Sequence, residues 1–214
     1  MLAAAVLTGD LIDSSAAGAV AADAAIALLR ASAEEIARWP GAVEPRFTRY
    51  RGDGWQVLVA PPGHALRAAV VLAARLRADA ALPQTRIAIG FGPVDVAPDG
   101  DLSAARGAGF EAAGHALDRM GSDQRLEAAG EGMTPLHRAT TGLIDERMTR
   151  WTAEQSQAMA LALDPGRPTQ AAIAAWLGIS AQAVSYRLRG AGAGAIRAAI
   201  EAWEAQAAPG ERQT

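Results

Sequence analysis

Residues 3–15, which read AAAVLTGDLIDSS, place carboxylates between a short apolar run and a long Ala-rich segment. The apolar run over residues 2–8 is typical of a buried β-strand, and Asp10 follows its end. Ser14 or Ser15 then stands where a helix N-cap is expected, because a serine hydroxyl can accept a hydrogen bond from the first helical turn. This order predicts a strand, a loop and a helix. A carboxylate at the strand tip can bind a divalent cation, and backbone N–H groups at the helix start can bind phosphates.

The rest of the N-terminal half continues this pattern as an α+β chain. Strands are expected at residues 2–8, 44–51, 55–60 and 85–91, helices at 15–38, 64–79 and 109–120, and a weaker strand at 124–129. The order β-α-β-β-α-β predicts a ferredoxin-like or palm fold, in which helices cover one face of an antiparallel sheet.

A hairpin supplies a second carboxylate. The turn Gly52-Asp53-Gly54 between the second and third strands is a strong hairpin signal. In the expected topology the first strand lies beside the hairpin, so Asp10 and Asp53 are predicted to lie together at one end of the sheet. Two such carboxylates can bind Mg²⁺ or Mn²⁺ together with a nucleotide, whose phosphates would complete the metal coordination. Taken singly, each aspartate also fits a structural role in a loop or turn.

From Thr134-Pro135 onward the sequence predicts helices only. They are expected at residues 135–149, 152–163, 169–177, 180–189 and 193–206, followed by a frayed tail at 207–214. We therefore expect an α+β domain over residues 1–130, a linker helix over 131–150 and an all-α helix-turn-helix domain over 151–214.

The helix-turn-helix prediction rests on the tight turn Gly178-Ile179-Ser180 between two short helices with apolar inner positions. Short polar and basic side chains occupy the expected outer face and helix starts, where contacts with double-stranded DNA would be made. These DNA-binding candidates are Thr169, Gln170, Ser180, Gln182, Ala183, Ser185, Tyr186, Arg187 and Arg189. A structural or protein-binding helical hairpin is the alternative.

Composition limits the function classes. The formal net charge of −3 excludes a whole-chain nucleic-acid footprint, yet residues 165–200 contain basic side chains (Arg167, Arg187, Arg189 and Arg197) and no acid. The chain has no cysteine, which excludes disulfides and fits a cytoplasmic location. The first apolar run is interrupted by Asp10 and lacks a basic flank, so no signal peptide is expected, and no stretch is apolar for long enough to span a membrane.

The C-terminal segment resembles the helix-turn-helix of many bacterial regulators. The pattern TQ-x-x-IA-x-x-LGIS-x-x-AVS-x-RL is matched from Thr169 to Leu188, within a resemblance that covers about 25 residues.

The N-terminal half resembles the SatD family and, more distantly, the class III nucleotidyl cyclase domain. The resemblance lies in TGDLIDS, RGDGWQVLV, RIAIGFGPV and GFEAAGHAL, within roughly residues 2–125. It implies metal binding at Asp10 and Asp53. It also implies nucleotide binding along the first loop and hairpin, at Leu11, Ile12, Asp13, Ser14, Ser15 and Gly52.

This sequence departs from the cyclase pattern at three places. The helix GFEAAGHALDRM offers no Asn and no in-register Arg for the transition state, although Arg119 lies close by. The chain has no lysine to read adenine, and Asp13 stands where cyclases have a glycine. These departures favour a homodimeric DNA-binding transcriptional regulator with a degenerate cyclase-like sensor or dimerisation domain. The alternatives are an active purine nucleotidyl cyclase or related phosphoryl-transfer enzyme with an attached DNA-binding domain, and a scaffold whose sheet domain only dimerises.

Overall fold

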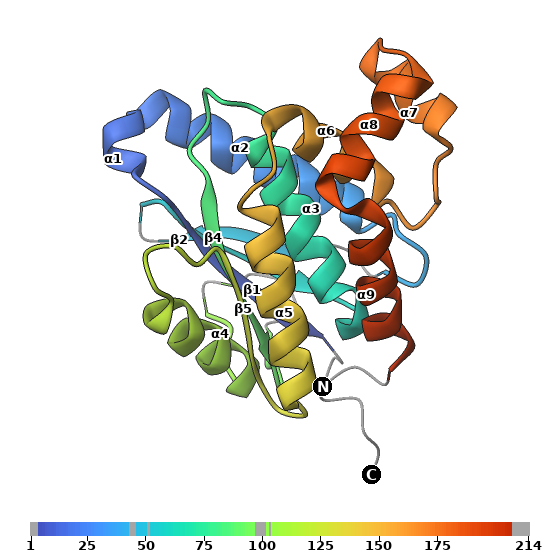
Figure 1. Ribbon diagram of the computed structural model, residues 1–214. Helices are drawn as coiled ribbons and strands as arrows, with labels where there is room; N and C mark the ends of the chain where they lie inside the picture. Colours follow the sequence, from blue (N-terminus) through green and yellow to red (C-terminus); the bar gives the residue numbers. More distant parts are fainter. Residues whose placement is uncertain (1–3, 43–45, 51, 97–101, 103, 207–214) are drawn as a thin grey trace.

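The computed structural model describes residues 4–42, 46–50, 52–96, 102 and 104–206, and shows a five-stranded mixed sheet with helices, followed by an all-helical C-terminal region (Figure 1). The strands are β1 (Ala5–Leu11), β2 (Arg46–Tyr50), β3 (Gly54–Val59), β4 (Thr85–Phe91) and β5 (Leu126–Gly130). The helices of the sheet region are α1 (Ser14–Ala17), α2 (Ala19–Ile36), the 3₁₀ turn η1 (Pro62–His64), α3 (Ala65–Arg77) and α4 (Ala108–Arg119). The C-terminal helices are α5 (Pro135–Met148), α6 (Ala153–Ala162), α7 (Gln170–Leu177), α8 (Ala181–Ala191) and α9 (Ala193–Ala205).

The sheet has the strand order β2-β3-β1-β4-β5. As expected, β1 lies beside the hairpin and pairs antiparallel with β3, and β2 and β3 form an antiparallel hairpin. On its other side, β1 pairs antiparallel with β4. The expectation of a purely antiparallel sheet is wrong for β5, which runs parallel to β4. The reason is the connection between them, because α4 returns the chain to the end of the sheet where β4 began.

Helices cover both faces of the sheet, which corrects the expectation that they cover one. Alternate residues such as Leu7 and Trp55 point toward α2 and α3 and form the main core. The other face is covered by α4, whose Ala113 packs near Val6 and whose Ala116 packs near Ala88. Figure 1 shows α4 on one side of the sheet and α3, α5 and α9 on the other. Because α2 and α3 already cover one face of the sheet, α4, which follows β4 in the chain, packs on the opposite face.

The predicted helix over residues 15–38 is interrupted. Gly18 has a φ of 85° and separates the four-residue α1 from the longer α2. A φ of this sign is strained for residues other than glycine, which explains why the break falls there. Predictions for residues 2–3, 44–45, 51 and 207–214 fall outside the described residues.

The C-terminal helices pack against the α2 and α3 side of the sheet region. One cluster of buried residues runs from the sheet through Met148, Trp151 and Met159 to Trp203. Arg77 at the end of α3 donates hydrogen bonds to the carbonyl oxygens of Thr149 (2.7 Å) and Trp151 (2.6 Å). The core therefore continues across the expected boundary between the linker helix and the C-terminal domain. Within the described part of the chain, no helix combines the length and apolar character needed to cross a membrane.

Candidate functional site

The carboxylate at the tip of β1 is paired with an arginine on the neighbouring strand. Asp10 lies opposite Arg86 of β4 and opposite Gly54 of β3 in the strand register. Arg86 Nε donates to Asp10 Oδ1 at 2.9 Å, and Arg86 Nη2 donates to Asp10 Oδ2. The two side chains are 27% and 29% exposed, so this two-point ion pair is partly shielded from water.

The hairpin carboxylate has a different partner. Ser14 Oγ donates a hydrogen bond to Asp53 Oδ2 at 2.6 Å, so this hydroxyl links the start of α1 to the β2–β3 turn. No side chain caps α1, and Asp13 occupies the N-cap position, which corrects the expectation that Ser14 or Ser15 is the cap.

Several carboxylates at this end of the sheet attract the guanidinium of Arg86. Its pKa is raised, first by the hydrogen bond with Asp10 and then by the electrostatic attraction of Asp10, Asp118 and Asp53, against the opposing effect of burial. Arg86 and Asp118 were not among the predicted site residues. The contact between Arg86 and Asp10 cannot be predicted from the sequence of either strand alone, because it depends on the register in which β1 pairs with β4.

The backbone at this end of the sheet is held firmly. A Cβ on Gly9 would lie 2.4 Å from an atom of the Trp55 ring, so only glycine fits beneath this buried tryptophan. Trp55 Nε1 donates to Thr85 Oγ1 (3.0 Å), and Thr85 Oγ1 donates to the carbonyl oxygen of Asp10 (2.7 Å). These contacts fix the carbonyl and, through it, the direction of the Asp10 side chain.

The predicted nucleotide-binding residues differ in burial, although the Ser14–Asp53 hydrogen bond holds the first loop beside the hairpin turn that contains Gly52. Leu11 is buried in the main core, and the backbone N–H of Ile12 donates to the carbonyl oxygen of Gln84 (2.8 Å). Asp13 and Ser15 are exposed, and Gly52 lies exposed in the hairpin turn with a φ of 80°. Asp13 has a φ of 53°, the left-handed conformation that glycine, Asn and Asp adopt most readily. Because α1 has only four residues, it offers no extended helix dipole for a phosphate.

These residues do not fit a divalent metal in the arrangement observed. Both oxygens of Asp10 accept hydrogen bonds from Arg86, and a metal between Asp10 and Asp53 would lie next to that guanidinium. Across the described ranges, three His, Asp or Glu side chains are nowhere grouped closely enough to hold a metal ion.

The second candidate site is the pair of helices α7 and α8. The turn between them begins at Gly178, which has a φ of 63° and ends α7 in the left-handed conformation. Thr169 Oγ1 accepts from the N–H of Ala172, and Ser180 Oγ accepts from the N–H of Ala183, both at 3.1 Å. Thr169 and Ser180 are therefore the N-caps of α7 and α8, a structural role that leaves both residues exposed at the surface.

The outer face of α8 carries three of the predicted residues. Gln182, Tyr186 and Arg189 are exposed and follow the spacing of one helix face. Arg189 lies over the Tyr186 ring at 5.5 Å, and Gln182 Nε2 lies 3.4 Å from the Tyr186 hydroxyl. The opposite face buries Val184 and Leu188.

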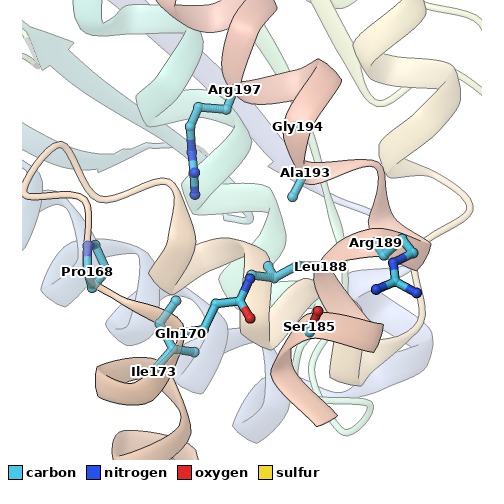
Figure 2. Close-up of a pocket in the computed structure, with 9 residues that line it drawn as sticks. All are labelled: Pro168, Gln170, Ile173, Ser185, Leu188, Arg189, Ala193, Gly194 and Arg197. Atoms are coloured by element: carbon cyan, nitrogen blue, oxygen red, sulfur yellow. The ribbon is translucent and has the colours of Figure 1, made fainter. Parts of the chain in front are cut away.

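A cavity of about 340 Å³ lies between α7, α8 and α9, next to Arg189 on the outer face of α8. Its polar lining comes from Gln170, Ser185, Arg189 and Arg197, and its floor includes Ile173. Figure 2 shows Arg197 reaching from α9 toward Gln170 and Leu188, while Arg189 lies on the α8 side. One Arg197 nitrogen donates to the carbonyl oxygen of Ala162 at 2.9 Å.

Two of the predicted DNA-binding residues lie away from the outer face of α8. Arg187 is half-buried and donates to Gln157 Oε1 of α6 at 3.1 Å, and Ala183 is also half-buried. Gln157 was not predicted, because only the packing of α8 on α6 brings it to Arg187.

A scan against protein-family models found no matching family, and searches of curated proteins and of solved structures also found no match.

Proposed function

We propose that this protein is a DNA-binding transcriptional regulator that contacts double-stranded DNA through α7 and α8. The proposal rests on one observation, the polar and basic outer face of α8 beside a cavity that also receives Arg197. Gln182 and Tyr186 suit base edges in a major groove, where the first turns of a recognition helix make contact, and Arg189 in the last turn of α8 suits a neighbouring phosphate. Gln170 and Arg197 suit the flanking phosphates.

The local charge supports this assignment. The acids of α9 are both neutralised by arginines, since Glu201 pairs with Arg167 (2.9 Å) and Glu204 pairs with Arg67 (2.6 Å). The surface near α8 therefore keeps Arg189 and Arg197 as positive charges without a local acidic excess, although the chain as a whole is acidic.

The sheet region is proposed to be a ferredoxin-like, degenerate cyclase-like sensor or dimerisation domain. The strand order β2-β3-β1-β4 and its antiparallel pairing support this assignment. The enzyme alternative requires carboxylates that are available to a metal. Because Asp10 is engaged by Arg86, we do not propose catalytic turnover.

Arg189→Ala is expected to weaken binding to a selected DNA site by about 10- to 100-fold, the loss typical of one base or phosphate contact in a specific complex. Selection from random DNA duplexes would supply the site, and fluorescence anisotropy at several salt concentrations would measure the affinity. A phosphate contact would lower the salt slope by about one for every sequence, whereas a base contact would relax one position of the site.

Arg119→Ala is the matched control, because it removes an equal charge from an exposed position on α4, across the sheet from α8. It should leave the affinity within about twofold, because the sheet lies between α4 and the α8 surface (Figure 1) and salt screens charges that do not contact the DNA. Equal losses in the two variants, or no DNA sequence selected by the wild type, would refute the proposal.

Reading two half-sites requires two copies, and α5 offers a surface for a second copy of this chain. Leu136 and Leu143 are 64% and 71% exposed and lie seven residues apart on one side of α5. A cavity of about 430 Å³ lies alongside, between α5 and α9, with Ile144, Ile196 and Ala199 in its lining. Nearby charges do not oppose self-association at this surface. Arg147 donates hydrogen bonds to the carbonyl oxygens of Gly190 and Ala191, and Glu146 forms an ion pair with Arg150.

Leu143→Glu is accordingly expected to weaken a homodimer by at least about 30-fold, because it places a charge in the apolar centre of the contact. Sedimentation equilibrium would measure the dissociation constant. Val20→Glu makes the same change at a residue of α2 that is 87% exposed, and should leave the constant unchanged. A monomeric wild type, or equal effects of the two substitutions, would exclude this surface.

A further inference from the structure

We infer that the guanidinium of Arg86 takes the place of a divalent cation at the end of the sheet, and that removing it turns the Asp10 and Asp53 carboxylates into a divalent-cation site. This inference concerns the sheet region only and does not depend on DNA binding. It follows from the disagreement between the metal site that the sequence predicts and the contacts that the carboxylates make.

The ion pair is built into the strand register. Asp10 and Arg86 are directly opposed on antiparallel strands and point to the same face as their neighbours Thr8 and Ala88. Opposed side chains of this kind start about 5 Å apart, so the long arginine side chain reaches both carboxylate oxygens without a change in the backbone. The pairing of β1 with β4 therefore places the guanidinium within hydrogen-bonding reach of Asp10.

The surrounding backbone holds Asp10 in place against Arg86, which disfavours displacement of the guanidinium by a metal ion. Thr85 Oγ1 donates to the carbonyl oxygen of Asp10, and the N–H of Ile12 donates to the carbonyl oxygen of Gln84, so both strands are tied at this point. Asp53 is oriented by Ser14 at 2.6 Å and contributes to the electrostatic attraction of Arg86. A metal would have to break a two-point ion pair and then remain beside the displaced positive charge.

The charge around Arg86 explains what its removal should do. One guanidinium is attracted by three carboxylates, those of Asp10, Asp53 and Asp118. Without Arg86 the carboxylates lose the cation that attracts them, and both oxygens of Asp10 become available to a metal on the side of the sheet end where Asp53 also acts. Mg²⁺ and Mn²⁺ are commonly held by one or two protein carboxylates, with water completing the coordination. Asp118 is not needed as a direct ligand, since its charge acts from a distance.

The test is a Mn²⁺ titration of the full-length protein followed by electron paramagnetic resonance of the free ion. We expect no stoichiometric uptake by the wild type, and one Mn²⁺ per chain bound by Arg86→Met with at least roughly tenfold higher affinity. Adding Asp10→Asn to Arg86→Met should abolish this uptake. Arg86→Lys keeps the positive charge and should bind no more Mn²⁺ than the wild type. Arg75→Met, which breaks the ion pair between Arg75 of α3 and Glu35 of α2, controls for the loss of an arginine elsewhere.

Each remaining outcome decides the question. Uptake of one Mn²⁺ by the wild type that is lost in Asp10→Asn would overturn the inference, because the metal would then bind despite Arg86. Arg86→Met that binds no more tightly than the wild type, or Arg86→Lys that binds as tightly as Arg86→Met, would also overturn it. If Arg86→Met is unfolded in metal-free buffer, recovery of its circular dichroism signal on adding Mn²⁺ supports the inference, and failure to recover contradicts it.

Discussion

Replacing Arg67 with methionine is expected to lower the free energy of unfolding by about 3–5 kcal/mol, because it breaks a buried ion pair from one side. Arg67 Nε and Nη2 donate to the two carboxylate oxygens of Glu204 at 2.7 and 2.6 Å, and Nη1 donates to the carbonyl oxygen of Leu163 at 2.9 Å. The two charged side chains are 6% and 21% exposed. Without the guanidinium, a shielded carboxylate and a carbonyl lose their donors. Urea unfolding followed by circular dichroism would measure the loss.

Two variants make this prediction specific. Arg75→Met removes an arginine from the same helix, but its partner Glu35 is 49% exposed, so the expected loss is only about 0–1 kcal/mol. Arg67→Met combined with Glu204→Met should recover a large part of the stability, because neither charge is then left unpaired. Equal small losses for Arg67→Met and Arg75→Met would mean that the Glu204 carboxylate is well hydrated.

This ion pair also bears on how the two parts of the chain act together. Arg67 belongs to α3 beneath the sheet, whereas Leu163 follows α6 and Glu204 belongs to α9. Arg77, farther along α3, contacts the chain between α5 and α6. The helices around α8 are therefore attached to the sheet region along the length of α3. For the sensor role proposed above, these contacts mean that a movement of α3 would carry a change in the sheet region to the helices around α8.

The sequence predicts those elements whose pattern is local. The apolar runs of β1, β3 and β4 and the Gly52-Asp53-Gly54 turn mark the strands and the hairpin to within a few residues of their observed bounds. The tight turn Gly178-Ile179-Ser180 is equally visible, because the left-handed Gly178 and the cap Ser180 act on the backbone next to them. Break points at single glycines are harder to predict, as Gly18 shows, since a long Ala-rich segment favours one continuous helix.

Side-chain partners that depend on the register of distant strands, or on how helices pack, were not predicted. The partner of Asp10 is set by the register of β1 against β4, which no local pattern in TRIAIGF specifies. Asp118 joins the site only because α4 lies on the second face of the sheet. The same placement decides which side chains of α8 remain outward, since Arg187 turns toward Gln157 once α6 packs beneath it.

Gly90→Ala is expected to cost about 3 kcal/mol, because α4 lies directly against the backbone of β4 at this residue. A Cβ on Gly90 would lie 2.0 Å from the carbonyl oxygen of Gly109 and 2.6 Å from the backbone nitrogen of Ala113. Backbone atoms of a helix cannot turn aside as a flexible side chain can, so the whole helix would have to move outward. Thermal unfolding by calorimetry, compared with the wild type, would measure the loss.

Gly114→Ala is the matched control, because it is the same substitution within α4 itself. A Cβ there meets no atom within 4 Å, and replacing a mid-helix glycine with alanine should stabilise the protein by about 0.5–1 kcal/mol. A gain in both variants would show that the contact between α4 and β4 is loose.

The Gly90→Ala variant also separates the two candidate sites. Outward movement of α4 withdraws Asp118 from Arg86, whereas α7 and α8 lie on the opposite side of the sheet and keep their own packing on α6 (Figure 1). At temperatures where the variant remains folded, DNA affinity should therefore be unchanged while stability is reduced. A loss of DNA affinity in this variant would instead show that α4 influences α8 through the sheet, and would make the face covered by α4 part of the regulatory path.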